Sequence, residues 1–168
     1  MAIVHKLFSD EEEKKAYNKI DYQLIAIHTT LEDYRLAYYI NKHLPVILSK
    51  CNTNVSIKNK LTEIQFSRFV FDDEKKEMTW NLIQNKNEFS SSNFTANTGL
   101  FTNSKTQISS KTYLIPEYKK VDYFLKIENS IESITIQNAL SEIKKIEQIS
   151  TVYAVAIETI KSKNNLIF

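Results

Sequence analysis

The feature that most limits how this chain can fold is its single glycine, Gly99, among 168 residues. An ordinary chain contains about 7% glycine. Loops that hold phosphate groups need glycines where the backbone approaches the ligand, so the P-loop and the Rossmann dinucleotide fingerprint are both excluded. Tight turns must then be built from other residues, and the chain is rich in asparagine. We therefore expect many asparagine-built turns.

Length and composition predict a single domain that spans residues 1–168. A hydrophobic content of 42% suffices for one core without cross-links. The formal net charge of +2 is too small to indicate a nucleic-acid-binding or membrane-surface protein. A single cysteine, Cys51, cannot form an internal disulfide or a multi-thiolate metal site, and no segment resembles an export signal or a membrane span. We expect a cytoplasmic protein with no cofactor and no metal.

Hydrophobic periodicity predicts an α+β fold. Helical spacing predicts two helices, and alternation with period two predicts strands and a hairpin; the segments are strand 21–29, helix 31–44, hairpin 63–84, strand 112–115, strand 121–128, helix 134–149 and strand 151–160. Their order favours a mainly antiparallel sheet with two helices packed on one face. The nearest template is a ferredoxin-like split βαβ arrangement with an extra hairpin and a short N-terminal helix at residues 9–19.

This template makes a prediction about two aspartates, Asp21 and Asp122, which each open a predicted strand. In a ferredoxin-like sheet the two strands would be parallel neighbours, and the carboxylates would meet at one end of the sheet. Such a pair could share a proton or hold a cation. We favour the alternative in which each aspartate accepts hydrogen bonds from the backbone or from lysine at a strand start.

A second prediction is a long polar loop at residues 85–111, where the composition shifts to asparagine, serine, threonine and lysine. A connection this long inside one domain is usually a lid, a binding loop or a disordered segment. Leu100 and Phe101 form an apolar hook within it. We treat this hook as a candidate contact element for a partner.

The stretch "LIPEYKKVDYFLKI" contains Pro116, one of only two prolines in the chain. The proline ring fixes its own backbone angle and pushes Ile115 into an extended conformation, so "TYLI" is predicted as a strand that ends there. Glu117 then lies in a turn before the strand that begins near Asp122. The stretch is therefore predicted to form the corner of a hairpin.

The segment "IPEYKKVDY" resembles the motif that gives the bacterial IPExxxVDY family its name. The matching residues are Ile115, Pro116, Glu117, Val121, Asp122 and Tyr123. The similarity extends to "IAIHTTLEDYRLAYYINK", "FSRFVFDDE", "TWNLIQNK" and "KSKNNLIF". The resemblance implies a cytoplasmic bacterial protein and supplies no catalytic residues, because the family has no established activity. The six motif residues are thus expected to be a structural corner or a ligand corner.

Side chains with potential chemistry are scattered through the sequence. Glu117 could act as a general acid or base, although a glutamate after proline is more often a turn residue paired with lysine. His28 and His43 lack a usual metal-ligand spacing, and nothing in the sequence around Cys51 activates its thiol. Short lysine pairs are usually solvated, so we do not favour nucleic-acid binding. We predict no catalytic and no metal-binding residues.

The most promising surface is the tyrosine cluster of the first helix, Tyr34, Tyr38 and Tyr39 around Arg35, because not all of these rings can face one core. The alternative is that the rings lie over the sheet edge with only their hydroxyl groups in solvent. Tyrosine and arginine are enriched where proteins bind partners. The leading hypothesis is therefore a non-enzymatic adaptor that binds a protein through Tyr34, Arg35, Tyr38 and the hook at 100–101. The sequence also leaves open that the chain forms a homodimer. The alternatives are a small-molecule-sensing domain resembling ACT-type modules and, less favoured, an enzyme that uses Asp122 or Glu117.

Overall fold

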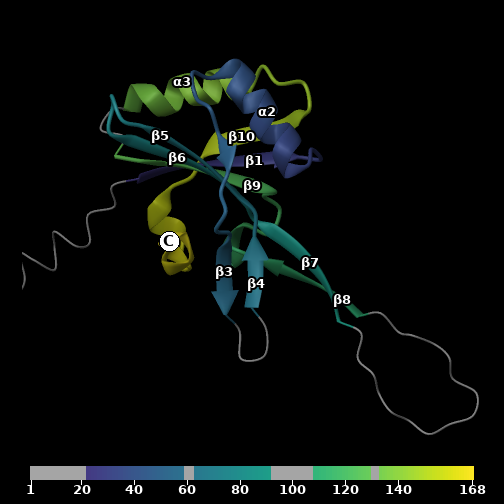
Figure 1. The fold of residues 1–168 in the computed structure, drawn as a ribbon. Helices are drawn as coiled ribbons and strands as arrows, with labels where there is room; N and C mark the ends of the chain where they lie inside the picture. Colours follow the sequence, from purple (N-terminus) through teal and green to yellow (C-terminus); the bar gives the residue numbers. More distant parts are fainter. Residues whose placement is uncertain (1–21, 59–62, 92–107, 130–132) are drawn as a thin grey trace, which may run out of the picture.

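The computed structural model describes residues 22–58, 63–91, 108–129 and 133–168 and shows an α+β fold (Figure 1). Its helices are α2 (Asp33–His43) and α3 (Ser133–Ile143), with short 3-10 helices η1 (Pro116–Tyr118), η2 (Ile157–Thr159) and η3 (Lys163–Leu166). Its strands are β1 (Tyr22–Thr29), β2 (Ser49–Lys50), β3 (Val55–Lys58), β4 (Glu63–Phe66), β5 (Arg68–Asp73), β6 (Met78–Gln84), β7 (Lys86–Ser91), β8 (Ile108–Tyr113), β9 (Tyr123–Glu128) and β10 (Ile149–Ala154). The helix predicted at residues 9–19, Asp21 and the hook at 100–101 lie outside the described residues.

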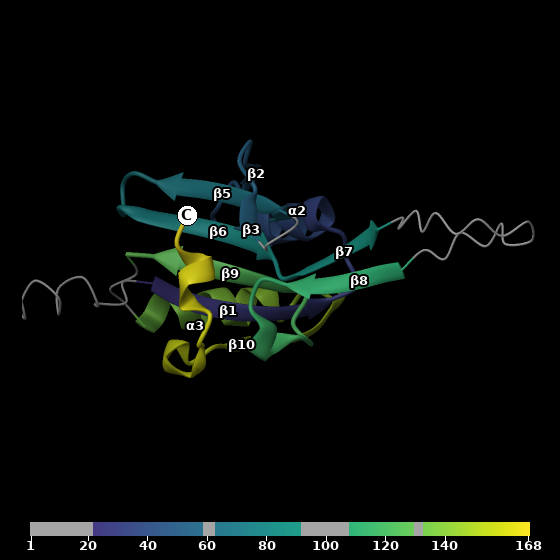
Figure 2. The same cartoon turned by 90° about the horizontal axis from the view of Figure 1, so that it is seen from below.

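Six strands form one sheet in the order β10-β1-β9-β6-β5-β2, and every neighbouring pair is antiparallel (Figure 2). The central strands β1 and β9 bury apolar residues on both faces, as the sequence of β1 predicts. In β1, Ile25 and Ile27 enter one core while Leu24 and Ala26 enter the other. A strand with this pattern must be covered on both sides, and this sheet is.

The helices α2 and α3 cover one face of the sheet (Figure 1). The buried residues of α2 repeat at helical spacing, and those of α3 do the same; they are Leu36, Ala37 and Ile40, and Ile136, Ala139, Leu140 and Ile143. The last turn of α2 ends before Pro45, which cannot continue a helix. The prediction of two helices on one face is confirmed.

The opposite face of the sheet holds a second core. The two-stranded ribbon of β3 and β4 and the C-terminal segment, residues 155–168, lie on this side (Figure 2). Phe66 from β4, Phe124 from β9 and Leu166 from η3 are fully buried together there. The chain therefore builds its sheet as a central layer between two apolar layers.

The predicted parallel pairing of the strands that follow Asp21 and Asp122 is wrong. The two strands, β1 and β9, are neighbours but run antiparallel, with Tyr22 opposite Glu128 and Ile27 opposite Tyr123. β9 also runs antiparallel to β6, to which it is connected through the β7–β8 ribbon. The start of β1 and the start of β9 thus lie at opposite ends of the sheet.

The prediction of a polar loop at residues 85–111 is wrong for the two ends of this segment, which form strands. Residues 86–91 form β7 and residues 108–113 form β8, and the two strands pair as an antiparallel ribbon. The ribbon extends away from the main sheet (Figure 1). Its strands contain few apolar residues, and this polar composition is why the sequence pattern predicted a loop.

Candidate functional site

The "IPEYKKVDY" segment connects two different sheets instead of forming a hairpin. It begins after β8, which pairs with β7, and leads into β9, which pairs with β1 and β6. Pro116 opens η1, and Ile115 before it is extended at φ −119°, as a residue before proline prefers. Ile115 and Val121 are buried in the second core. The predicted hairpin is therefore wrong, although the extended backbone before Pro116 is confirmed.

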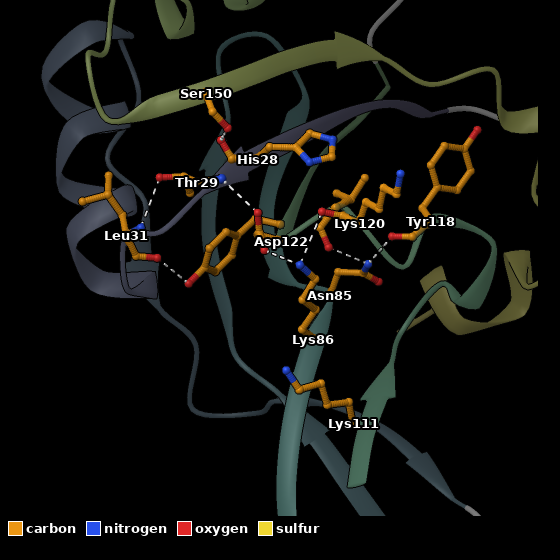
Figure 3. Close-up of polar contacts among 12 residues, drawn as sticks. His28, Thr29, Leu31, Asn85, Lys86, Lys111, Tyr118, Lys120, Asp122 and Ser150 are labelled. Carbon is orange, nitrogen blue, oxygen red and sulfur yellow. Dashed lines mark hydrogen bonds and ion pairs between the residues drawn. The ribbon is translucent and has the colours of Figure 1, made fainter.

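The segment is organised around Asn85, a fully buried residue between β6 and β7 that sequence analysis did not identify. Its Nδ2 donates to the carbonyl oxygens of Tyr118 and Val121, both at 2.9 Å. Its Oδ1 accepts from the backbone N–H of Ile115 at 2.9 Å. Figure 3 shows Asn85 beside this corner. Nothing in the sequence distinguishes Asn85 from the many asparagines in turns, which explains the omission.

Glu117 anchors the C-terminal segment. Its Oε1 accepts the backbone N–H groups of Lys161 at 2.8 Å and Ser162 at 2.9 Å, and its carboxylate also accepts the Ser162 hydroxyl. Partial burial raises the pKa of Glu117, but the hydrogen bonds outweigh that effect and hold the pKa below its usual value. An ionised carboxylate that accepts backbone hydrogen bonds suits a structural role, since a general acid at neutral pH needs a raised pKa.

Asp122 joins β9 to the end of β1 and to β7. Its Oδ2 accepts the backbone N–H of Thr29 at 3.0 Å, and its Oδ1 lies 2.6 Å from the Lys86 ammonium (Figure 3). Asp122 thus accepts bonds from the backbone and from lysine at a strand start, as the favoured interpretation predicts. The lysine is Lys86, which lies far from Asp122 in sequence.

The next residue, Tyr123, fastens the chain between β1 and α2. Its hydroxyl donates to the carbonyl oxygen of Leu31 at 2.9 Å. Burial raises the pKa of Tyr123 from 10.0 to about 12, and the nearby carboxylates of Asp33, Asp122 and Glu32 add to the increase. The motif's polar groups therefore hold three distant segments: the C-terminal segment, the end of β1 and the start of α2.

Two open hollows flank this corner. One has a volume of about 430 Å³ and is lined by Thr29, Thr30, Leu31, Gln84, Lys86, Glu88, Asp122 and Tyr123. The other, of about 340 Å³, lies over η1 and is lined by Pro116, Glu117, Tyr118, Lys119, Lys120, Val121 and Tyr153. Asp122 and Glu117, the two carboxylates singled out in the motif, line different hollows. The structure therefore does not join them in one acid–base site.

The predicted contact residues of α2 lie on its outer surface. Tyr34 is 59% exposed and Tyr38 is 63% exposed, and Arg35 between them is exposed as well. The Tyr38 ring meets Tyr39 edge to face at 5.5 Å, and Tyr39 packs against the helix-side core. We call Tyr34, Arg35 and Tyr38 the α2 face.

The start of α2 is held to the sheet by Asp33. Its carboxylate lies 2.9 Å from the Lys50 ammonium and also accepts the Ser67 hydroxyl. Burial raises the pKa of Asp33, but the hydrogen bonds from Ser67 and Lys50 outweigh burial and lower it overall. The α2 face is thus presented on a helix that is fixed in position.

The other candidate side chains do not converge on a site. His28 stacks on Tyr153 at 5.7 Å, while His43 lies by a separate hollow beside Lys145 and Glu147. A hydrogen bond with the Thr53 hydroxyl lowers the pKa of Cys51. Within the described residues, no group of three or more histidine, cysteine, aspartate or glutamate side chains is placed to hold a metal ion.

Comparison with known proteins identified no relative of this chain. No family model, no curated protein and no solved structure matches the chain. The resemblance to the IPExxxVDY family therefore stays a prediction from the motif. No helix in the described part of the chain is long and apolar enough to cross a membrane.

Proposed function

We propose that this protein is a non-enzymatic adaptor that binds another protein through the α2 face. The observation that carries the proposal is the exposure of two tyrosines, 59% and 63%, on either side of an exposed arginine on a fixed helix. Tyrosine supplies a large contact area at a low cost in conformational entropy, and tyrosine and arginine dominate the residues that contribute most to protein interfaces.

The charge of this face indicates what it would contact. Arg35 is joined by the exposed Lys42 and by His43 in the last turn of α2, and no salt bridge pairs these residues with a carboxylate in the described structure. Guanidinium and ammonium groups favour carboxylates in a partner. We therefore propose a protein surface that offers aspartate or glutamate side chains next to an apolar contact for the two rings.

The motif supports this assignment by what its carboxylates already do. Glu117 accepts hydrogen bonds from the C-terminal segment, and Asp122 accepts them from Thr29 and pairs with Lys86. A general base must instead be free to reach the proton that it abstracts. The geometry favours a binding role over a catalytic role for this chain.

The test is site-specific photo-crosslinking in the host cell. A photoreactive phenylalanine replaces Tyr38 in one variant and Tyr153 in the control variant, since Tyr153 is a partly exposed tyrosine on β10. We expect one discrete, nuclease-resistant protein adduct from position 38 only. Arg35→Ala should weaken the purified complex by about 2 kcal/mol, or roughly 30-fold in Kd, without unfolding the domain. Equal adducts from both positions, or none from position 38, would contradict the proposal.

A second candidate function rests on the 430 Å³ hollow beside the motif corner. Its lining combines the Lys86 ammonium, the carboxylates of Asp122 and Glu88, and the hydroxyl groups of Thr29 and Thr30. These groups suit a small zwitterionic molecule such as an amino acid, as an ACT-type sensing domain would bind. Thermal stabilisation of wild type by free amino acids, lost in Lys86→Met, would favour this function over the adaptor.

A further inference from the structure

A cluster of hydrogen-bond donors lies on the sheet face opposite the helices. Asn81 on β6 is directly across from Lys126 on β9, and both point to the same face as their buried neighbours Ile83 and Phe124. Arg68, on the adjacent strand β5, donates from its Nε to the Asn81 Oδ1 at 2.9 Å. Three strands therefore bring a guanidinium, an amide and an ammonium together.

An aromatic ring covers this cluster. The Phe168 ring centroid is 4.3 Å from the Arg68 guanidinium carbon and 4.7 Å from the Lys126 Nζ. The Tyr22 ring lies 4.8 Å from the same Nζ. Phe168 is 43% exposed, so the covering ring lies at the surface of the molecule, whereas Lys126 and Asn81 beneath it are buried.

The two cations of the cluster, Lys126 and Arg68, differ in the partners that they have. Lys126 pairs with the Glu128 carboxylate and donates to the Leu166 carbonyl oxygen at 2.7 Å. Arg68 has no carboxylate partner among the described residues. Glu128 therefore pairs with one of the two cations, and no side-chain carboxylate of the described residues forms a salt bridge with the other.

Asn81 gives an independent indication of a missing acceptor. Its Nδ2 is a buried side-chain atom without a hydrogen-bond partner in the described structure, while its Oδ1 is taken by Arg68. A buried donor left unpaired costs about 1–3 kcal/mol, so such groups normally meet a water or an ion. A water would satisfy the amide but would bring no negative charge to the Arg68 guanidinium.

We propose that the juxtaposition of Arg68, Asn81 and Lys126 beneath Phe168 is a binding site for a small oxyanion, that is, a carboxylate or phosphate group. The guanidinium matches two oxygens of such a group, and the Asn81 Nδ2 supplies a further donor. The ammonium of Lys126 adds positive charge on the neighbouring strand. The site lies on the opposite face of the sheet from α2, so it is independent of the proposed adaptor function.

The proposal is tested by titrating the full chain with inorganic phosphate and, separately, with sodium acetate, each at constant ionic strength balanced with sodium chloride. One readout is the NMR signal of the Asn81 side-chain amide, which reports on the unpaired donor itself. The other is thermal unfolding: at an anion concentration tenfold above Kd, the midpoint should rise by about 3–6 °C for a chain of this size.

Matched charge variants separate a specific site from general screening. Arg68→Met removes one positive charge from the cluster, and Lys111→Met removes one from an exposed position on β8. We expect the anion effect to be lost in Arg68→Met and kept in Lys111→Met. A response to phosphate alone or to acetate alone identifies the group that the site prefers.

Two results would overturn the proposal. One is an Asn81 amide signal in the wild-type chain that neither anion moves, which needs no variant to fold. The other is an equal thermal shift in wild type, Arg68→Met and Lys111→Met, which would show only a non-specific salt effect.

Discussion

At the scale of single residues, Asn85 shows how much one buried amide can organise. Its side chain makes three hydrogen bonds to backbone groups of the motif segment, and its own backbone N–H donates to the Asp122 carbonyl oxygen at 2.9 Å. A buried polar side chain is stable only when its hydrogen bonds are made. Asn85 therefore fixes the path of the chain from η1 into β9.

Replacing this amide should destabilise the whole domain. In Asn85→Ala the N–H of Ile115 and the carbonyl oxygen of Val121 lose a buried partner, and the carbonyl oxygen of Tyr118 keeps only its bond from the Val121 N–H. We expect a loss of about 3 kcal/mol in the free energy of unfolding, measured by urea denaturation. The control is Asn164→Ala, an exposed asparagine that should change the free energy by no more than about 0.5 kcal/mol. Equal effects of the two changes would refute the role of Asn85.

The hydroxyl of Tyr123 predicts a dependence of stability on alkaline pH. Because burial raises the pKa of Tyr123 to about 12 in the folded state, the unfolded chain loses this proton first, near pH 10. Stability should therefore fall as pH rises from about 10 to about 12. Phenolate absorbance should show a late-titrating group that is absent from Tyr123→Phe. The burial argument would be contradicted if the wild-type curve differed from that of Tyr123→Phe only by one tyrosine with an ordinary pKa.

The left-handed turn positions show what a chain with one glycine does instead. Glu77 at φ 54° and Asn129 at φ 57° are the non-glycine residues with positive φ in the described structure. Asparagine tolerates this conformation, as the sequence analysis expected for turns, whereas glutamate ordinarily does not. The Asn129 Nδ2 also donates to the Glu77 carbonyl oxygen at 3.2 Å. Composition alone could not assign a glutamate to such a position.

At the scale of elements, the C-terminal segment closes the second core. Val155, Ile157, Ile160 and Leu166 enter this core, while Glu117 holds the intervening backbone at residues 161–162. The "KSKNNLIF" stretch, quoted for its family resemblance, thus contacts the "IPEYKKVDY" stretch directly. The two segments therefore pack together on one face of the sheet.

Two adjacent residues in this segment give a matched test. Leu166 is fully buried, whereas Ile167 is 76% exposed. Leu166→Ala should cost about 2–4 kcal/mol in the free energy of unfolding because it leaves a cavity in the core. Ile167→Ala should change the value by no more than about 0.5 kcal/mol. If the two changes had similar effects in urea denaturation, the packing of this segment would differ from that described.

Elements with strong periodicity could be predicted from the sequence, and those set by distant partners could not. The two-sided apolar pattern of β1 and the helical spacing of α2 and α3 indicated their type and their buried faces. The mostly polar sequence of the β7–β8 ribbon has no such pattern. The segment "EIQFSRFVF" appears continuous but divides at Ser67, because β4 pairs with β3 and β5 pairs with β6.

At the scale of the whole molecule, structural and proposed binding roles are separated in space. The motif corner connects the end of β1, the start of α2 and the C-terminal segment. The α2 face lies instead on the solvent-exposed side of α2. The helical spacing predicted the buried face of α2, but the sequence left open whether Tyr34 and Tyr38 are exposed or lie over the sheet edge; the structure shows both exposed. The partners of Glu117 and Asp122 could not be predicted, because each lies dozens of residues away in sequence.

The central claim is that the polar groups of the motif hold the fold together. The most direct measurement is the urea denaturation midpoint of the isosteric triple variant Glu117→Gln, Asp122→Asn, Tyr123→Phe, compared with the triple variant Tyr34→Ala, Arg35→Ala, Tyr38→Ala. The account predicts a clearly lower midpoint for the motif variant, because it loses hydrogen bonds and an ion pair at three segments. The α2-face variant should keep the wild-type midpoint. A motif variant as stable as wild type would contradict the claim and return these residues to the search for a catalytic or ligand-binding role.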